Sequence, residues 1–255
     1  MSRMPVLFVG HGTPMNAIED NRFSNKWKEL GKSLPKPKAI LMISAHWFTY
    51  GEFIRTAEKN CQIYDMYGFP KELYEVIYEP KGDPELAKEI LDCLGKDAQE
   101  DNGWGLDHGG WEVLVRMYPS ANIPVIELSI NANWSTQKYF EIGQKLKYLR
   151  EKGVLIIGSG NISHNLSILN FDMEEMGYKD TIDFDQEVKT HILAHEFSKV
   201  LDYSKIKGKR SAFISIEHFA PIAYVLGAVD ENDSIEVFNE GYVGGSLSMT
   251  SYLFK

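Results

Sequence analysis

The apolar residues of this chain gather into short continuous runs and do not alternate with polar residues. Such runs are typical of strands buried on both faces, as in parallel sheets covered by helices. The clearest run covers residues 39–43 and continues through Ser44 and Ala45 to His46. On this pattern we predict strands at residues 6–9, 39–45, 52–56, 124–130, 154–157 and 212–216. Residues 234–238 and 244–253 are predicted to be edge strands, or a strand and a helix, that close the domain.

Stretches with helix-start signals lie between these runs. Ser24 is suited to cap a helix that ends near Gly31, and Asp83, followed by Pro84, starts a helix that ends near Leu94. Further helices are predicted at residues 111–117, 136–150, 183–203 and 221–226. Strands that alternate with helices predict an α/β fold, with a central, mostly parallel or mixed sheet flanked by helices on both faces. Because no linker or shift in composition interrupts the pattern, we expect one domain over residues 1–255.

Composition and charge narrow the class of partner. The chain has 255 residues and a net charge of −9, with acidic and basic residues interleaved. This distribution argues against nucleic acid or an anionic membrane, which need a concentrated basic surface. The first predicted strand leaves no room for a secretory signal, and Cys61 and Cys93 form no CxxC pair. We therefore expect a cytoplasmic protein, monomeric or a small homo-oligomer.

Four of the apolar runs are each followed by a histidine at or just past their end. These histidines are His11, His46, His164 and His218. In α/β sheets, ligands bind in the crevice outside the carboxyl ends of the strands, and neutral imidazole is the commonest metal ligand. We therefore predict a mononuclear metal centre at the carboxyl-end rim of the sheet.

The residue types leave the metal and its chemistry open. Imidazole ligands suit Zn, Fe, Cu or Ni. Open positions on Fe(II) would accept a chelating substrate together with O₂, whereas open positions on Zn would hold an activated water for hydrolysis. A protein that binds metal without catalysis is the third possibility.

Other segments carry weaker signals. His108 follows Asp107 in a glycine-rich stretch before a helix, and a histidine beside a carboxylate is suited to acid/base catalysis. The aromatic stretch 60–80 could wall a pocket for a flat substrate. His191 and His195 have helical spacing but lack the glutamate of HExxH, so we assign them no metal. The GxGxxS pattern at residues 158–163 lacks the continuation of a dinucleotide loop.

Several short motifs occur in the order that one enzyme family has them. They are Gly10-His11-Gly12-Thr13-Pro14-Met15, Ser44-Ala45-His46-Trp47, Leu106-Asp107-His108-Gly109, Gly158-Ser159-Gly160-Asn161-Ile162-Ser163-His164-Asn165-Leu166, Glu217-His218-Phe219 and Gly245-Ser246-Leu247-Ser248-Met249. Together they resemble the DOPA-dioxygenase branch of the LigB-type (class III) extradiol ring-cleavage enzymes. The resemblance covers nearly the whole chain.

This resemblance implies one extradiol catalytic domain over residues 1–255 that opens the ring of a catechol, such as DOPA or a related small compound, with O₂. It implies that His11, His46 and His218 bind the metal. His164 matches a position that can approach the metal or serve as a base, and His108 matches a catalytic histidine. Fe(II) is the expected metal, and Zn(II) is plausible in purified protein. The wider class uses two histidines and a carboxylate, so the pairing of His218 with Glu217 leaves the role of that carboxylate open.

Overall fold

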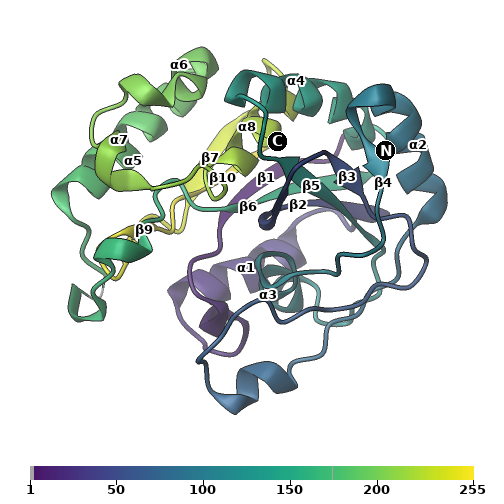
Figure 1. The fold of residues 1–255 in the computed structure, drawn as a ribbon, viewed down its shortest axis with the longest axis horizontal. Helices are drawn as coiled ribbons and strands as arrows, with labels where there is room; N and C mark the ends of the chain where they lie inside the picture. Colours follow the sequence, from purple (N-terminus) through teal and green to yellow (C-terminus); the bar gives the residue numbers. More distant parts are fainter. Residues whose placement is uncertain (1–2, 174) are drawn as a thin grey trace.

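The computed structural model describes residues 3–173 and 175–255, which form an eight-stranded sheet between helices (Figure 1). The strands of this sheet are β1 (Val6–Gly10), β2 (Ala39–Thr49), β3 (Phe53–Ile54), β4 (Gln99–Glu100), β5 (Val125–Asn131), β6 (Val154–Gly160), β7 (Ile235–Phe238) and β10 (Ser251–Phe254). A separate two-stranded sheet joins β8 (Tyr242–Val243) to β9 (Leu247–Ser248). The α-helices are α1 (Arg22–Ser33), α2 (Pro84–Leu94), α3 (His108–Met117), α4 (Thr136–Leu146), α5 (Lys179–Leu193), α6 (Phe197–Leu201), α7 (Lys209–Ala212) and α8 (Ala220–Ala228).

The centre of the sheet is parallel and its margins are mixed. The strand order is β4-β3-β5-β2-β6-β1-β10-β7. Strands β5, β2, β6 and β1 run parallel to one another, whereas β3 pairs antiparallel with β5 and β10 pairs antiparallel with β1. The carboxyl ends of β1, β2 and β6 therefore meet along one rim, as expected for a site built at strand ends.

Alternate residues of each central strand supply two separate cores. In β1, Val6 and Phe8 pack with residues of α2, α4, α5 and α8, while Leu7 and Val9 pack with residues of α1 and α3. All four side chains are fully buried. This two-sided burial explains why the strands read as continuous apolar runs, and it confirms the predicted α/β class with helices on both faces.

The structure corrects two predicted helix starts. Helix α1 begins after Asn21, whose side chain accepts hydrogen bonds from the backbone of Phe23 and Ser24, and Ser24 completes the capping box from within the helix. Helix α3 begins at His108 and not at Trp111, because the Asp107 side chain caps it. Asp83 caps α2 as predicted, and Ser135 caps α4.

The prediction of a strand at residues 212–216 is wrong. Ala212 ends α7, and only Phe213 forms a bridge, to His164. The Phe213 ring packs against Phe184 and Phe219, while Ile214 is 77% exposed. Aromatic packing beside the sheet thus replaces strand pairing, and His218 stands in the loop before α8.

The predicted helix at residues 183–203 is two helices. Helix α5 ends at Leu193 and α6 starts at Phe197. His195, at φ 55°, takes the left-handed conformation that breaks the helix between them. Among the described residues, no helix is long and apolar enough to span a membrane.

Candidate metal centre

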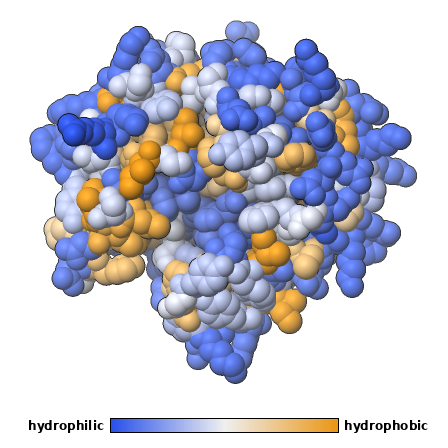
Figure 2. Space-filling model, in the orientation of Figure 1, coloured by the Kyte–Doolittle hydropathy of each residue, from blue (hydrophilic) through white to orange (hydrophobic). Residues whose placement is uncertain are grey.

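Five histidines from separate segments line one cavity of about 360 Å³ at the carboxyl-end rim. His11 follows β1, His46 lies within β2, His108 begins α3, His164 follows β6, and His218 precedes α8. In Figure 2 the centre of this face is hollowed where Figure 1 has the ends of β1 and β6. The sequence prediction named all five. The prediction placed His46 at the end of a strand, whereas it lies inside β2, because β2 continues to Thr49 and shifts register between Ile43 and Phe48.

Ring nitrogens of His11, His46 and His218 lie within 4.8 Å of one another. The Nε2 atoms of His11 and His46 are 3.4 Å apart. Two nitrogens that bind one tetrahedral metal at about 2.1 Å are separated by roughly 3.4 Å, so this spacing fits a shared ion. The Nε2 atom of His218 is buried with no hydrogen-bond partner among the described residues, which a metal would relieve.

Each of these three rings is held through its Nδ1 atom. Ser159 donates its hydroxyl proton to the Gly109 carbonyl at 2.6 Å, so its oxygen accepts from His11 Nδ1 at 2.9 Å. The Nδ1 atom of His218 lies 3.2 Å from Glu217 Oε1. Contacts of this kind fix the tautomer and leave the Nε2 lone pair toward the centre.

His46 obtains the same support from Asp65. Asp65 Oδ2 lies 3.1 Å from His46 Nδ1 and 3.0 Å from His108 Nδ1. Burial raises the pKa of Asp65, but the interactions with His108 and His46 outweigh it and hold that pKa well below its ordinary value. Asp65 is therefore an ionised carboxylate that contacts the Nδ1 atoms of both histidines.

Asp65 was not among the predicted site residues, and Asp107 was expected to tune the pKa of His108. Asp107 instead accepts hydrogen bonds from Ser44 at 2.6 Å and from the backbone of Gly110, and so joins the start of α3 to β2. One signal for Asp65 was available, since it is the one acidic residue between Asn60 and Gly68 in the aromatic stretch. Short-range spacing could not connect it to His46 and His108.

Burial keeps most of the histidines neutral. The pKa of His11 and that of His218 are lowered well below the usual value by burial and by the neighbouring histidines. Burial is also the main cause that lowers the pKa of His164 to about 4 and that lowers the pKa of His108. His46 differs: burial lowers its pKa, but Asp65, Asp107 and Glu217 together raise it above the usual value. Neutral imidazoles are the form that binds metal.

His164 stands beside the three converging rings. Its ring stacks on His218 with centroids 3.5 Å apart. Within the part of the chain that the structure describes, its ring nitrogen groups with Glu217 and His218, and not with His11 and His46. This placement favours contact with a bound substrate over direct coordination.

A glycine allows helix α3 to approach the histidine rings closely. A Cβ atom on Gly109 would lie 2.6 Å from Ser44 Oγ, 2.9 Å from His46 Cδ2 and 3.3 Å from His11 Cε1. The first turn of α3 therefore packs directly against the histidines only because residue 109 has no side chain.

The remaining histidine pair lies away from this cavity. His191 Nδ1 is 2.8 Å from Glu196 Oε2, and His195 packs on Phe197 beyond the end of α5. The two rings thus have local partners, which agrees with assigning them no metal.

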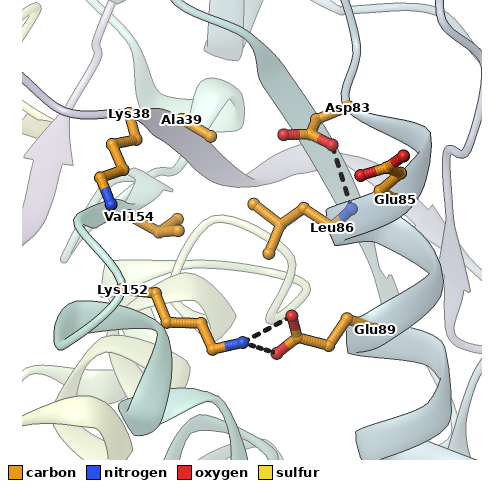
Figure 3. A pocket seen from close by; sticks show the side chains of 8 residues that line it. All are labelled: Lys38, Ala39, Asp83, Glu85, Leu86, Glu89, Lys152 and Val154. Atoms are coloured by element: carbon orange, nitrogen blue, oxygen red, sulfur yellow. Dashed lines mark hydrogen bonds and ion pairs between the residues drawn. The ribbon is translucent and has the colours of Figure 1, made fainter.

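A second hollow, of about 400 Å³, lies at the opposite end of the sheet, where β2 and β6 begin (Figure 3). Three of its charged side chains have partners: Lys152 contacts Glu89 at 2.6 Å, and Asp83 accepts from the backbone of Leu86 (Figure 3). Nothing in this hollow resembles the histidine cluster.

The comparisons with known proteins agree with this geometry. Residues 5–255 match the family model described as the catalytic LigB subunit of aromatic ring-opening dioxygenase. A protein named 4,5-DOPA dioxygenase extradiol from Escherichia coli K12 is 39% identical, covering 98% of this chain and 94% of its own length. A protein of the same name from Beta vulgaris is 38% identical over 97% of this chain and 95% of its own. The crystal structure of an uncharacterized protein from Escherichia coli K12 superposes with a TM-score of 0.87 at 37% identity, covering 99% of this chain and 100% of the other.

Two buried glutamates behind the cluster generate a prediction about stability. Glu112 and Glu127 have no hydrogen-bond partner among the described residues, and burial raises the pKa of each well above its ordinary value. Between the unfolded and folded pKa the folded state binds more protons, so stability falls as the pH rises. The slope is at most about 1.4 kcal/mol per pH unit for one group.

We therefore expect Glu112→Gln to unfold at a higher urea concentration than the parent protein at pH 8, with a smaller difference at pH 5. Glu141→Gln, an exposed substitution of the same kind, controls for the change in net charge. A constant difference between Glu112→Gln and the parent from pH 5 to pH 8 would show that Glu112 is ionised in the folded state.

Proposed function

Because the chain belongs to the LigB family of aromatic ring-opening dioxygenases, we propose that it opens the ring of a small catechol with O₂ at a mononuclear metal held by His11, His46 and His218. The observation that carries this proposal is the convergence of three imidazole nitrogens in a buried cavity. Residues 1–255 would form one catalytic domain. The free thiols of Cys61 and Cys93 are in keeping with a reducing, cytoplasmic location.

LigB extradiol dioxygenases use a non-haem metal, and the donor set here suits one. His11, His46 and His218 would hold it, each through Nε2. When bound, Fe(II) would supply the redox change and the open positions that a chelating catechol and O₂ require, whereas Zn(II) would fit the site but has no redox change to offer. Both atoms of O₂ end in the ring-opened product, so the reaction needs no external reductant.

His164 is the proposed base. Its pKa of about 4 leaves it unprotonated at neutral pH, and it lines the cavity beside His218. It would accept a proton from a catechol hydroxyl, so that the substrate binds as an anion. The charge of Glu217 favours the protonated ring that results, because that carboxylate raises the pKa of His164 against the effect of burial.

His108 is the proposed acid. Burial lowers its pKa, so it starts neutral, with Nδ1 beside Asp65. It would take the second hydroxyl proton and return it as the oxygen–oxygen bond breaks. The Asp65 carboxylate stabilises the transient imidazolium. This role needs His108 to stay near the substrate without binding the metal.

Oxygen uptake tests the proposed activity most simply. We expect anaerobic protein reconstituted with Fe(II) to consume one O₂ per catechol when air is admitted, with a new yellow absorbance. The Zn(II) form should consume none. Lack of uptake across a set of catechols, with iron bound, would contradict the proposed function.

Substitution of two histidines separates a ligand from a proton donor. His46→Ala should lose metal binding, whereas His108→Ala should keep one metal per chain and lose about 10²–10⁴-fold in turnover. Metal content by plasma mass spectrometry and turnover on the same samples give both values. Unchanged metal content in His46→Ala would remove His46 from the ligand set, and full activity in His108→Ala would refute its acid role.

Asp65→Asn tests the carboxylate that holds His46. Loss of such support typically costs 10–100-fold in metal affinity, so we expect a rise of that size in the Zn(II) dissociation constant, measured against a coloured chelator. Asp92→Asn, on the exposed face of α2, is the control. Equal affinities for the two variants would mean that Asp65 does not orient His46.

A further inference from the structure

Among the described residues, no lysine or arginine lines the cavity to pair with a carboxylate. Beyond the histidines, most of the lining residues are neutral, and the larger apolar ones are Met66, Phe69, Leu166, Leu169, Phe171 and Leu247. Its remaining ionisable side chains are Asp65 and Glu217, both acidic. All lysines and arginines of the chain are among the residues that the structure describes, and none of them lines this cavity.

The mouth of the cavity is apolar as well. Leu166 is 61% exposed and Phe171 is 71% exposed, on the segment that follows His164. Figure 2 shows apolar residues gathered beside the central hollow, over the part of the chain near β9. Exposed apolar side chains at the rim of a pocket are typical of a site that binds an apolar group.

The lack of lysine and arginine and the apolar mouth determine which substituent on the catechol ring would bind well. The histidines would take the diol end, so a ring substituent would extend away from them, among neutral lining residues that include Phe69, Leu166 and Phe171. A carboxylate held there without a cationic partner would lose part of its hydration. It would also meet the charges of Asp65 and Glu217 and the field of a chain with net charge −9. An alkyl or aryl substituent would instead bury apolar surface on both sides.

We propose that the preferred substrate is a catechol whose ring substituent is uncharged and apolar, selected by the apolar lining of the cavity, which includes Phe69, Leu166 and Phe171. This proposal rests on the proposed ring-opening function and deepens it. The proposed substrate differs from DOPA, the compound in the names of two relatives. The side chain of DOPA carries both a carboxylate and an ammonium group.

Binding without turnover tests the proposal. The Zn(II)-loaded protein is titrated anaerobically, by calorimetry, with 4-ethylcatechol, 3,4-dihydroxyphenylacetate, dopamine and L-DOPA. The first two differ by a methyl group against a carboxylate at nearly the same size. We expect 4-ethylcatechol to bind at least about tenfold more tightly than 3,4-dihydroxyphenylacetate and L-DOPA, and no less tightly than dopamine. Equal or tighter binding of the acid or of DOPA would overturn the proposal, and tighter binding of dopamine would overturn it in favour of a cation paired with Glu217.

A charge added to the mouth provides a matched test. Leu166→Lys should narrow the gap between 4-ethylcatechol and 3,4-dihydroxyphenylacetate by about fivefold or more. Ile77→Lys, at a site that is 77% exposed and outside the cavity lining, should leave the gap unchanged. The same change in both variants would show that Leu166 does not face the substituent, and this would contradict the proposal.

Different results would refute the proposed ring-opening function and the inferred substrate preference. If the binding order holds but the Fe(II) protein does not cleave 4-ethylcatechol, the ring-opening function is wrong and the assignment of the cavity stands. If the Fe(II) protein cleaves L-DOPA with a higher kcat/KM than 4-ethylcatechol, the function stands and the inferred preference is wrong.

Discussion

The site depends on one constraint: three imidazole rings must present Nε2 to the same buried point, although they come from segments far apart in the chain. Parallel strands bring two of them together, because β1 and β2 end along one rim on either side of β6, and the loop before α8 supplies His218. Strand ends alone do not orient a ring. The orientation comes from the groups at Nδ1, which are Ser159 for His11, Asp65 for His46 and Glu217 for His218.

Close packing around the histidine rings limits which substitutions the neighbouring residues can accept. Helix α3 starts against the histidines, with Gly109 almost in contact with His46 and His11. Asp107 joins this first turn to Ser44 on β2, and so couples the helix to the strand that carries His46. The scaffold and the site are thus one packed unit, in which a side chain added at residue 109 would move the rings themselves.

Much of this arrangement could be predicted from the sequence, because it depends on local pattern. Continuous apolar runs indicated a buried sheet, and the position of each histidine near the end of a run indicated one rim. His218 reached the cavity for a different reason, since the run before it packs as an aromatic cluster around Phe213 and does not pair as a strand. Periodicity alone could not distinguish these two fates of an apolar run.

What the sequence could not supply were contacts between distant segments. Asp65 lies in an aromatic loop, and only the fold brings it to His46 and His108. Asp107 was adjacent to His108 in the chain, but helix capping took its carboxylate elsewhere. The apolar lining of the cavity likewise combines Phe69 with residues about 100 positions later, Leu166 and Phe171, so its lack of a lysine or arginine is visible only in three dimensions.

The central claim is that one metal sits among the Nε2 atoms of His11, His46 and His218. A crystal structure of the anaerobic Fe(II) protein, with anomalous diffraction at the iron edge, tests it directly. The account predicts a single iron at about 2.1 Å from those three atoms, with His108 and His164 uncoordinated. Iron located instead among His46, Asp65 and His108, whose donor atoms also lie within 4.8 Å of one another, would contradict it.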